Sequence, residues 1–545
     1  MNRGRAQPVR EQIRSAGEQL LGLNSLRPAQ EEALLAVLDG HDTLVVLSTG
    51  SGKSAIYQIA GSLIPGPTVV VSPLIALQKD QSERLEDPRT GGAAVINSTS
   101  GQRAEHAALA GLERDALEFI FLAPEQLQRP ELLARLRAAK PTLFVVDEAH
   151  CISEWGHDFR PDYLALGDVI ESLGHPPVLA LTATASRPVR DEIAARLRMR
   201  FPNVVAGDMD RPNIFLSVSR AATQAKKLAA LLEAVEHADK PGIVYAATRR
   251  HAEEVAAALE ARGLRADFYH GGIGNGARVR VQDAFMSGRL DVLAATSAFG
   301  MGIDQPNIRF VHHYDVSDSL DAYYQQIGRA GRDGEAAEAR LFWRPEDLSL
   351  YKFFAGGGKL KAEDIETVVD VLEERGELAG SELAEETRLS RFKLAKATAE
   401  LIDQGAVEKD AEGVLSSTGN VETGQAADAA VEHERRRHER QLRALDRMRI
   451  YAEMLDCRRQ YLLEYFGEPA EPCGRCDNCR RGALEAAPQE PFPVSARVVH
   501  RKLGKGLVLA HDGGRMTVLF DDAGEKVFDT KYAASRNLIE RVHQA

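Results

Sequence analysis

The stretch that decides the fold is Ser48-Thr49-Gly50-Ser51-Gly52-Lys53-Ser54, which follows the apolar run TLVV (43–46) and precedes a stretch with helical periodicity. A glycine-rich turn between a strand and a helix is the context that a phosphate-binding loop requires. Its glycines let backbone N–H groups approach phosphates, and the helix N-terminus adds a favourable dipole. We expect residues 49–54 to bind a nucleotide, with Lys53 on the β- and γ-phosphates and Ser54 on Mg²⁺. Leu47 stands where the strict pattern has glycine.

Apolar runs that end in small or polar residues recur after this loop and alternate with helical stretches. Such alternation predicts parallel sheets with crossover helices. A break near residues 205–213 divides the runs into two series, which predicts two α/β domains. The runs are TLVVLS, TVVVSP, FIFLAP, LFVVDEAH and PVLALTAT in the first series, and GIVYAATR, ADFYHGG, DVLAATSAFG and FVHHYDV in the second.

An acidic pair, Asp147-Glu148, ends the run LFVV and is followed by Ala149-His150. The carboxyl end of a parallel strand is where such sheets bind ligands. We expect Asp147 to hold Mg²⁺, Glu148 to orient or activate the attacking water, and His150 to serve in coupling. The alternative is an exposed acidic loop, which the phosphate loop upstream disfavours.

Two arginines lie three residues apart in the segment Gln325-Gln326-Ile327-Gly328-Arg329-Ala330-Gly331-Arg332 of the second α/β series. A turn punctuated by glycine can direct Arg329 and Arg332 at a nucleotide across a cleft, and an arginine finger stabilises the transition state of phosphoryl transfer. We group Gln325 with them as catalytic. Because these residues come from the other domain, ATP is expected to close the cleft and hydrolysis to open it. The alternative is a solvated basic loop.

The motifs TGSGKS, DEAH, LTATA (181–185), ATSAFGMGID (295–304) and YYQQIGRAGRDG (323–334) follow one another in the order of superfamily 2 helicases. Two segments resemble the RecQ family in particular. In LGLNSLRPAQ (21–30) the resemblance implies that Gln30 reads the adenine edge and Arg27 supports it, while Leu23 replaces the aromatic residue that is usual in the family. The other segment, CISEWGHDFRPDY (151–163), is similar to the aromatic-rich loop of that family.

This aromatic loop also has a physical interpretation of its own. Trp155 and Phe159 can stack on DNA bases, Arg160 can meet a phosphate, and His157 lies between them. A loop of this kind, directly after the catalytic acid, can switch hydrolysis on when a strand is bound. The alternative is that Trp155 and Phe159 belong to the hydrophobic core.

Four of the five cysteines form the pattern C-x15-C-x2-C-x2-C at Cys457, Cys473, Cys476 and Cys479. This pairing favours a tetrahedral Zn²⁺ site, and four cysteines leave no position for water, so that the zinc is expected to be structural. The segment also resembles the zinc subdomain of RecQ proteins. The alternative is a redox role, and the fifth residue, Cys151, is expected to be a free thiol.

The remaining segments depart from the order that is usual in the family. Residues 361–404 predict three helices and residues 405–418 a hairpin with Gly413 in its turn, the order of a winged helix. Its third helix begins basic, at Arg391, Lys393 and Lys396, but ten acidic residues lie between 361 and 390, so that a protein-docking module is the alternative. A single helix is expected from about Asp428 to Tyr465. The tail resembles the small Tudor-like barrel of UvrD/PcrA-type helicases, and three roles are open for it: binding of a protein partner, binding of DNA, or packing alone.

We therefore expect an α/β protein in five parts. They are a RecA-like domain with the ATP site (1–205), a RecA-like domain with the arginine fingers (206–350), a winged-helix-like module (361–418), a helical zinc-binding subdomain (428–482) and an SH3/Tudor-like β-barrel (494–545).

The resemblance implies an ATP-, Mg²⁺- and Zn²⁺-dependent DNA helicase that travels 3′ to 5′ on single-stranded and forked or junction DNA in repair and recombination. The net charge of −12 does not itself indicate nucleic acid, and no apolar run is long enough for a membrane span, so that a cytoplasmic protein is expected. A nucleic-acid-binding scaffold with a dead ATPase and an RNA helicase are the alternatives.

Overall fold

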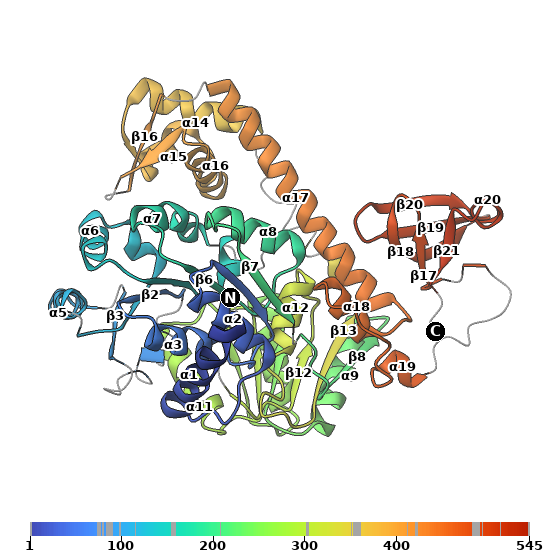
Figure 1. Ribbon diagram of the computed structural model, residues 1–545. Coiled ribbons are helices and arrows are strands. Elements are labelled where there is room, and N and C mark those ends of the chain that lie inside the picture. The colour runs from blue at the N-terminus through green and yellow to red at the C-terminus, as the bar shows by residue number, and fades with distance from the viewer. Residues whose placement is uncertain are drawn as a thin grey trace. The chain divides into compact units, whose positions relative to one another are not determined.

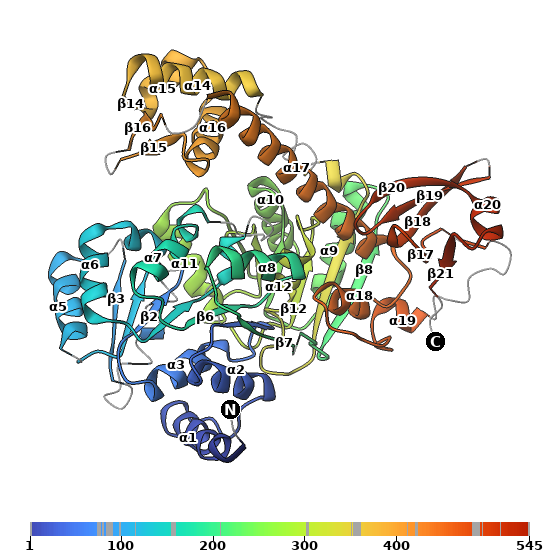
Figure 2. The ribbon, with the colours of Figure 1, turned by 45° about the horizontal axis from the view of Figure 1, so that its top comes forward.

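The computed structural model describes residues 3–542, apart from gaps at 74–77, 79–80, 83–84, 86–90, 98–99, 115, 154–159, 208, 301–304, 350, 352–360, 411–412, 420–422, 482–490, 493 and 513. The chain forms two compact units. The first contains residues 1–344, 450–520 and 525–545, and the second contains residues 345–449 and 521–524. Figures 1 and 2 show the elements of both units in two views.

The first parallel sheet has the strand order β3-β4-β2-β5-β6-β1-β7. Its strands are β1 (Thr43–Leu47), β2 (Thr68–Val71), β3 (Ala93–Ile96), β4 (Phe119–Leu122), β5 (Leu143–Val146), β6 (Val178–Thr182) and β7 (Asn203–Gly207). The apolar runs predict the five central strands correctly, and every residue in them is buried. The two edge strands, β3 and β7, were missed because their residues are partly exposed and form no continuous apolar run.

Helices cover this sheet and supply its core. They are α1 (Arg3–Leu21), α2 (Pro28–Leu38), α3 (Lys53–Leu63), α5 (Gln102–Glu113), α6 (Pro130–Ala139), α7 (Leu166–Ser172) and α8 (Arg187–Arg196). Figures 1 and 2 both show α1, α2 and α3 side by side. Tyr57 of α3 is fully buried and packs edge-on against Phe119 and Phe121 of β4, which fixes α3 on the sheet.

The second parallel sheet has the strand order β10-β11-β9-β12-β13-β8. Its strands are β8 (Ile214–Arg220), β9 (Gly242–Tyr245), β10 (Ala266–Tyr269), β11 (Val292–Ala295), β12 (Phe310–His313) and β13 (Ala337–Trp343). The helices beside it are α9 (Gln224–His237), α10 (Arg249–Glu260), α11 (Asn275–Met286) and α12 (Leu320–Ile327). Strands β8 and β13 were missed because charged and polar residues interrupt their apolar pattern.

The helical region that ends in the cysteines differs from the single helix expected between Asp428 and Tyr465. Helix α17 (Thr423–Glu453) begins earlier, and a second helix, α18 (Arg458–Tyr465), follows it. The break falls where Cys457 caps α18, since its sulfur accepts a hydrogen bond from Gln460 N. A short helix, α19 (Asp477–Arg481), carries the last cysteine.

The tail is a five-stranded antiparallel sheet in the order β20-β19-β18-β17-β21, as expected for a small barrel. Its strands are β17 (Arg497–His500), β18 (Gly504–Asp512), β19 (Arg515–Phe520), β20 (Gly524–Asp529) and β21 (Ile539–Arg541), with helix α20 (Thr530–Ser535) before the last strand. Val498, Leu507 and Val518 are fully buried and form part of its core.

The second compact unit has the element order of a winged helix. Three helices, α14 (Ala362–Arg375), α15 (Gly380–Thr387) and α16 (Arg391–Asp403), accompany the strands β14 (Leu378–Ala379), β15 (Val407–Lys409) and β16 (Val414–Ser417). The three helices and the hairpin around Gly413 confirm the expected elements, and the two-residue strand β14 completes the sheet order β14-β16-β15. Ala427 and Ala430, on the first turns of α17, belong to the same hydrophobic core.

Among the helices that the structure describes, none combines the length and the apolar character that a membrane span requires.

Candidate nucleotide-binding and zinc sites

The phosphate loop joins β1 to α3 as the sequence predicts. Gly50 and Gly52 have φ angles of +78° and +79°, which a residue with a side chain rarely adopts. The side chain of Lys53, the first residue of α3, bends back so that Nζ donates to Leu47 O at 2.9 Å and Ser48 O at 3.2 Å. Burial lowers the pKa of Lys53, and the neighbouring carboxylates Glu148 and Asp147 oppose that change. The loop therefore presents a partly desolvated cation at the end of the sheet.

The acidic pair follows β5 on the same edge of the sheet. Asp147 is buried, and its N–H donates to Val71 O at 2.8 Å, which continues the sheet by one residue. Glu148 has a left-handed backbone (φ +48°), and its N–H donates to Asp147 Oδ1 at 3.0 Å. Burial and the adjacent Glu148 raise the pKa of Asp147 to about 7 against the effect of Lys53. Two carboxylates crowded beside a lysine suit the binding of a divalent cation.

His150 links the acidic pair to the segment LTATA. Its Nδ1 lies 3.0 Å from Thr182 Oγ1 and 3.4 Å from Glu148 Oε2. Thr182 Oγ1 in turn lies 3.0 Å from Thr184 O, to which it donates. His150 thus joins β6 to Glu148, and the coupling role that we expected for it stays a prediction.

Gln30 supports the phosphate loop. Its Nε2 donates to Ser51 O and Gly52 O, both at 3.0 Å, and its Oε1 accepts from Arg27 N at 2.9 Å. A Cβ atom at Gly52 would lie 2.7 Å from Gln30 Nε2, so that only glycine allows this approach. The adenine contacts of Gln30 and Arg27 remain a prediction, and the structure adds a second role for Gln30 as a brace of the loop.

The arginine turn lies against the phosphate loop. A Cβ atom at Gly328 would lie 2.9 Å from Thr49 Oγ1, and one at Gly50 would lie 3.5 Å from Arg332 Cγ. Arg332 is also close enough to Lys53 to lower the pKa of that lysine. The structure therefore brings Arg332 of the second α/β domain and Lys53 of the first to one site. Gln325 lies buried on α12, three residues before the turn.

Several buried polar atoms at this junction await a partner. Among the described residues, Thr49 Oγ1, Ser51 Oγ and Arg329 Nε have no hydrogen-bond partner. Orphaned polar groups in a protein interior are rare, and a phosphate group offers the acceptor oxygens that these donors need. Together with the lysine and the acidic pair, this donor set fits ATP and Mg²⁺.

Arg211 is a residue of this site that the sequence analysis did not single out. It lies in the segment between the two sheets and donates hydrogen bonds to Thr49 O at 3.1 Å and Gly328 O at 3.0 Å. The only sequence signal was the polar run Asp210-Arg211-Pro212-Asn213 at the domain break.

The aromatic loop is only partly described. Trp155, His157 and Phe159 lie outside the described residues, so that their contacts with DNA remain predictions. Arg160 is half-buried, and its Nη1 donates to Pro73 O at 3.0 Å. The end of the loop is thereby tied to the segment that follows β2. Cys151 is buried and forms no disulfide bond, as expected.

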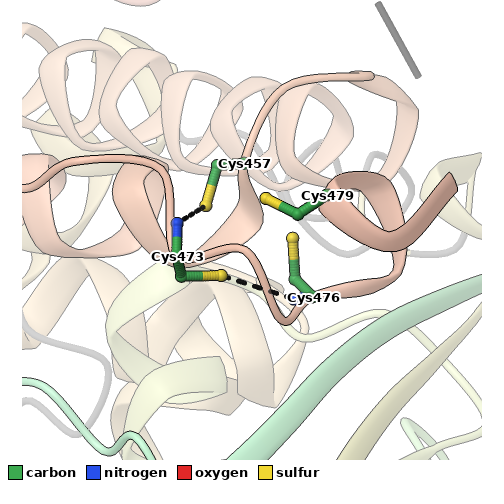
Figure 3. A group of neighbouring side chains, drawn as sticks. All are labelled: Cys457, Cys473, Cys476 and Cys479. Atoms are coloured by element: carbon green, nitrogen blue, oxygen red, sulfur yellow. Dashed lines mark hydrogen bonds between the residues drawn. The ribbon is translucent and has the colours of Figure 1, made fainter. Parts of the chain in front are cut away.

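The four cysteines converge on one point, as Figure 3 shows. The sulfur atoms of Cys457, Cys473, Cys476 and Cys479 all lie within 4.8 Å of one another. Backbone N–H groups donate to two of them, from Cys473 N to Cys457 Sγ at 3.2 Å and from Cys476 N to Cys473 Sγ at 3.3 Å. A hydrogen bond from Cys457 lowers the pKa of Cys476, which favours a thiolate. Four converging sulfurs with N–H donors fit a structural Zn²⁺ ion.

The cysteine-bearing helices dock on the second sheet through a buried ion pair. Arg458 Nε lies 2.6 Å from Asp477 Oδ1, and Asp477 Oδ2 accepts from Val218 N of β8 at 3.0 Å. They also reach α8 of the first α/β domain, since Arg190 donates to Phe466 O at 2.6 Å. The zinc-binding region therefore contacts both α/β domains.

Two parallel-sheet domains, with a phosphate loop and an acidic pair on one and an arginine turn on the other, define an ATP-driven helicase of superfamily 2. Family models agree with this class. The DEAD/DEAH box helicase model matches residues 27–192, the helicase conserved C-terminal domain model matches residues 225–334, and the RecQ zinc-binding model matches residues 416–480.

Curated relatives specify the family. The probable ATP-dependent DNA helicase RecS of Bacillus subtilis (strain 168) is 37% identical over 455 residues, which are 83% of this chain and 88% of that protein. The ATP-dependent DNA helicase RecQ of the same strain is 33% identical over 493 residues, which are 89% of this chain and 70% of that protein. The chain belongs to the RecQ family and is an ATP-dependent DNA helicase.

A solved structure shows the same fold. The DUF1998 helicase MrfA bound to DNA aligns with a TM-score of 0.52 and 15% identity over 76% of this chain and 60% of that one. These comparisons confirm the expected family, the fold class, the use of ATP and DNA, and the zinc site.

Proposed function

We propose that this helicase couples ATP hydrolysis to 3′-to-5′ travel along one strand and separates the duplex ahead of it, in DNA repair and recombination. The observation that carries the motor mechanism is the position of the arginine turn. A Cβ atom at Gly328 would lie 2.9 Å from Thr49 Oγ1, so that the turn approaches the phosphate loop too closely for a side chain at this position. The polarity and the cellular role follow from membership of the family.

Residues of the first α/β domain bind and orient ATP. Lys53 exchanges its contacts with the loop carbonyls Leu47 O and Ser48 O for the β- and γ-phosphates, while Gln30 holds the loop in shape. Ser54 and Asp147 would hold Mg²⁺, which neutralises phosphate charge when it is bound. Glu148 orients the attacking water, and His150 holds that acid next to β6.

The second α/β domain supplies the positive charge that stabilises the transition state. Arg329 and Arg332 stabilise the transferred phosphoryl group, an effect worth roughly 10³–10⁵ in kcat for arginine fingers. Loss of the γ-phosphate removes the charge that draws this turn toward the phosphate loop. Hydrolysis therefore opens the cleft, and repeated closing and opening moves the protein along DNA.

Two variants test the ATP site. Lys53→Ala should abolish hydrolysis because the phosphates lose their cation, and Glu148→Gln should bind ATP while kcat falls by roughly 10²–10⁴. The matched control is Arg135→Ala, which removes only a surface ion pair with Glu113 in the same domain. Substantial hydrolysis in both site variants would refute the assignment of this site, whereas wild-type protein that hydrolyses no ATP with or without DNA would favour a scaffold protein.

Substrates with defined tails test polarity and nucleic-acid preference. Unwinding should require a 3′ single-stranded tail on the DNA strand along which the protein moves, and a blunt or 5′-tailed duplex should remain intact. Unlabelled single-stranded DNA should compete with this reaction better than RNA of the same sequence. Unwinding of only 5′-tailed duplexes, or stronger competition by RNA, would contradict the proposal.

We propose a docking or spacer role for residues 361–418. Lys393 lies 2.7 Å from Asp364, and Lys396 pairs with Glu434, so that both lysines expected on DNA form ion pairs inside their own unit. The side chain of Arg391 lies outside the described residues.

We also propose that the barrel binds a protein partner, since Val527 and Tyr532 are 62% and 58% exposed. Loss of partner binding on Tyr532→Ala, with ATP hydrolysis unchanged, would test this role. A helicase that acts on chromosomal DNA with cellular ATP is proposed to work in the cytoplasm, and fractionation with a DNA-free control would test that location.

A further inference from the structure

The short segment that joins the two sheets, Met209–Asn213, is bonded from both sheets and from the zinc-binding helices. Asn213 Nδ2 donates to Gly331 O and Glu335 O, both at 2.8 Å. Met209 O accepts a hydrogen bond from Tyr324 of α12. The segment is thus bonded on both sides of the arginine turn.

Arg211 lies at the centre of this segment and donates four hydrogen bonds to backbone carbonyls. Its Nη1 reaches Thr49 O at 3.1 Å and Gly328 O at 3.0 Å, and its Nη2 reaches Ala330 O at 2.7 Å and Gly331 O at 2.8 Å. One guanidinium group therefore spans the phosphate loop of the first sheet and the turn that carries Arg329 and Arg332.

Residues of α18 and of the loop between α18 and α19 hold the neighbours of Arg211. Glu468 Oε2 accepts from Met209 N at 3.1 Å, Arg459 pairs with Asp210, and Arg475 Nη1 donates to Pro212 O at 3.2 Å. Both flanks of Arg211 are fixed by these contacts, so that its side chain is directed at the cleft.

We propose that Arg211 is a positioning residue for ATP hydrolysis, which holds the arginine turn in register with the phosphate loop. This inference rests on the proposed hydrolysis at that junction. Arg211 donates only to carbonyl oxygens in the structure and acts through Arg329 and Arg332. Through Glu468, Arg459 and Arg475, the zinc-binding region holds in place the segment that carries Arg211.

The geometry requires a guanidinium group. Arginine offers five N–H donors in a rigid planar fork, whereas lysine offers three donors on one flexible ammonium group. A lysine at this position keeps the charge, but its three donors lie on one nitrogen and cannot bond all four carbonyls at once. Arg211→Lys therefore separates the bridging geometry from the charge.

The test compares Arg211→Lys and Arg211→Ala with wild type in steady-state hydrolysis on saturating single-stranded DNA. Because misplacement of a catalytic group by about 1 Å can lower a rate by about 10²-fold, we expect kcat to fall by roughly 10- to 100-fold. Affinity for ADP should stay within roughly threefold of wild type, because the phosphate loop itself is intact. Affinity for ADP with aluminium fluoride, which mimics the transition state, should fall together with kcat.

Arg262→Ala is the matched control. Arg262 Nη1 lies 2.7 Å from Glu236 Oε1 in a surface ion pair of the second α/β domain, away from the arginine turn. We expect this control to keep kcat near the wild-type value.

Three outcomes would overturn the role of Arg211. They are equal losses of kcat in Arg211→Lys and Arg262→Ala, a fall in ADP affinity as large as the fall in kcat, and wild-type affinity of Arg211→Lys for ADP with aluminium fluoride. Wild-type protein that hydrolyses no ATP would refute the proposed function. The affinity for ADP with aluminium fluoride tests the role of Arg211 separately, because this measurement requires no turnover.

Discussion

Replacement of Asp477 is expected to loosen the zinc-binding helices from the second sheet. Its carboxylate accepts Arg458 Nε at 2.6 Å, Arg458 Nη2 at 3.1 Å and Val218 N at 3.0 Å. The side chains of Arg458 and Asp477 are only 2% and 6% exposed. Asp477→Asn keeps the size and one acceptor oxygen, but it leaves the Arg458 guanidinium buried without its counter-charge.

The burial of this pair sets the magnitude. Removal of one partner from a buried ion pair destabilises a protein by about 3–5 kcal/mol, because the remaining charge is left uncompensated. Since every 1.4 kcal/mol is a factor of ten, local opening of α18 and α19 should become roughly 10²- to 10³-fold more frequent. Adding Arg458→Met to Asp477→Asn should recover a large part of the loss, because no charge then remains buried.

Hydrogen exchange measured by mass spectrometry gives the free energy of local opening for amides in α18 and α19. Arg481→Ala is the matched control, because Arg481 is 65% exposed and lies 3.8 Å from the same carboxylate. A surface pair of this kind contributes at most about 1 kcal/mol. Exchange in Asp477→Asn no faster than in Arg481→Ala would refute the reasoning, and so would a double variant less stable than Asp477→Asn.

Four further predictions follow from the same structure. Cys476→Ser should abolish the single zinc expected per chain and remove folding free energy on the order of 10 kcal/mol from the cysteine-bearing helices, and wild type without zinc in metal analysis would contradict the site. Trp155→Ala should nearly preserve DNA affinity but weaken the stimulation of hydrolysis by single-stranded DNA, and unchanged stimulation would make Trp155 structural. Burial lowers the pKa of His313 from 6.5 to about 4, so that the unfolded chain binds the extra proton first as the pH falls. The contribution of neutral His313 to the free energy of unfolding is fully present above pH 6.5 and is lost as the pH falls toward 4, by about 3 kcal/mol. Calorimetric melts between about pH 7 and about pH 5 should show a smaller shift in His313→Asn than in wild type, and an equal shift would contradict this assignment. Alanine at both Lys393 and Lys396 should lower the melting temperature of residues 361–418 without changing the salt dependence of DNA binding, and a slope smaller by about two would restore the DNA-contact interpretation.

The phosphate loop, the acidic pair and the cysteine pattern could be predicted from the sequence because each is local. Residues 48–54 lie on one turn, and their spacing alone places backbone N–H groups around a phosphate. Three of the four cysteines fall within seven residues, so that their convergence needs little help from the rest of the chain. The central strands were predictable for a related reason, since burial on both faces requires continuous apolar runs.

Edge strands and the ends of helices were harder to predict. Strands β3 and β7 are partly exposed, and no apolar run marks them. One helix was predicted up to Tyr465, but α17 ends at Glu453 and Cys457 begins α18 as its N-cap. The role of a sulfur as a cap and a metal ligand at once depends on the fold around it.

Only the tertiary structure decided which groups meet across the chain. Arg211 bonds carbonyls at Thr49 and Gly328, which lie 162 and 117 residues away from it in the sequence. Lys396, in the basic first part of α16, forms an ion pair with Glu434. Charge and spacing along a sequence define which contacts a side chain can make, but the packing of distant elements selects one of them. The sequence by itself therefore determined the chemistry of the motor, and the fold decided how its two halves are held in register.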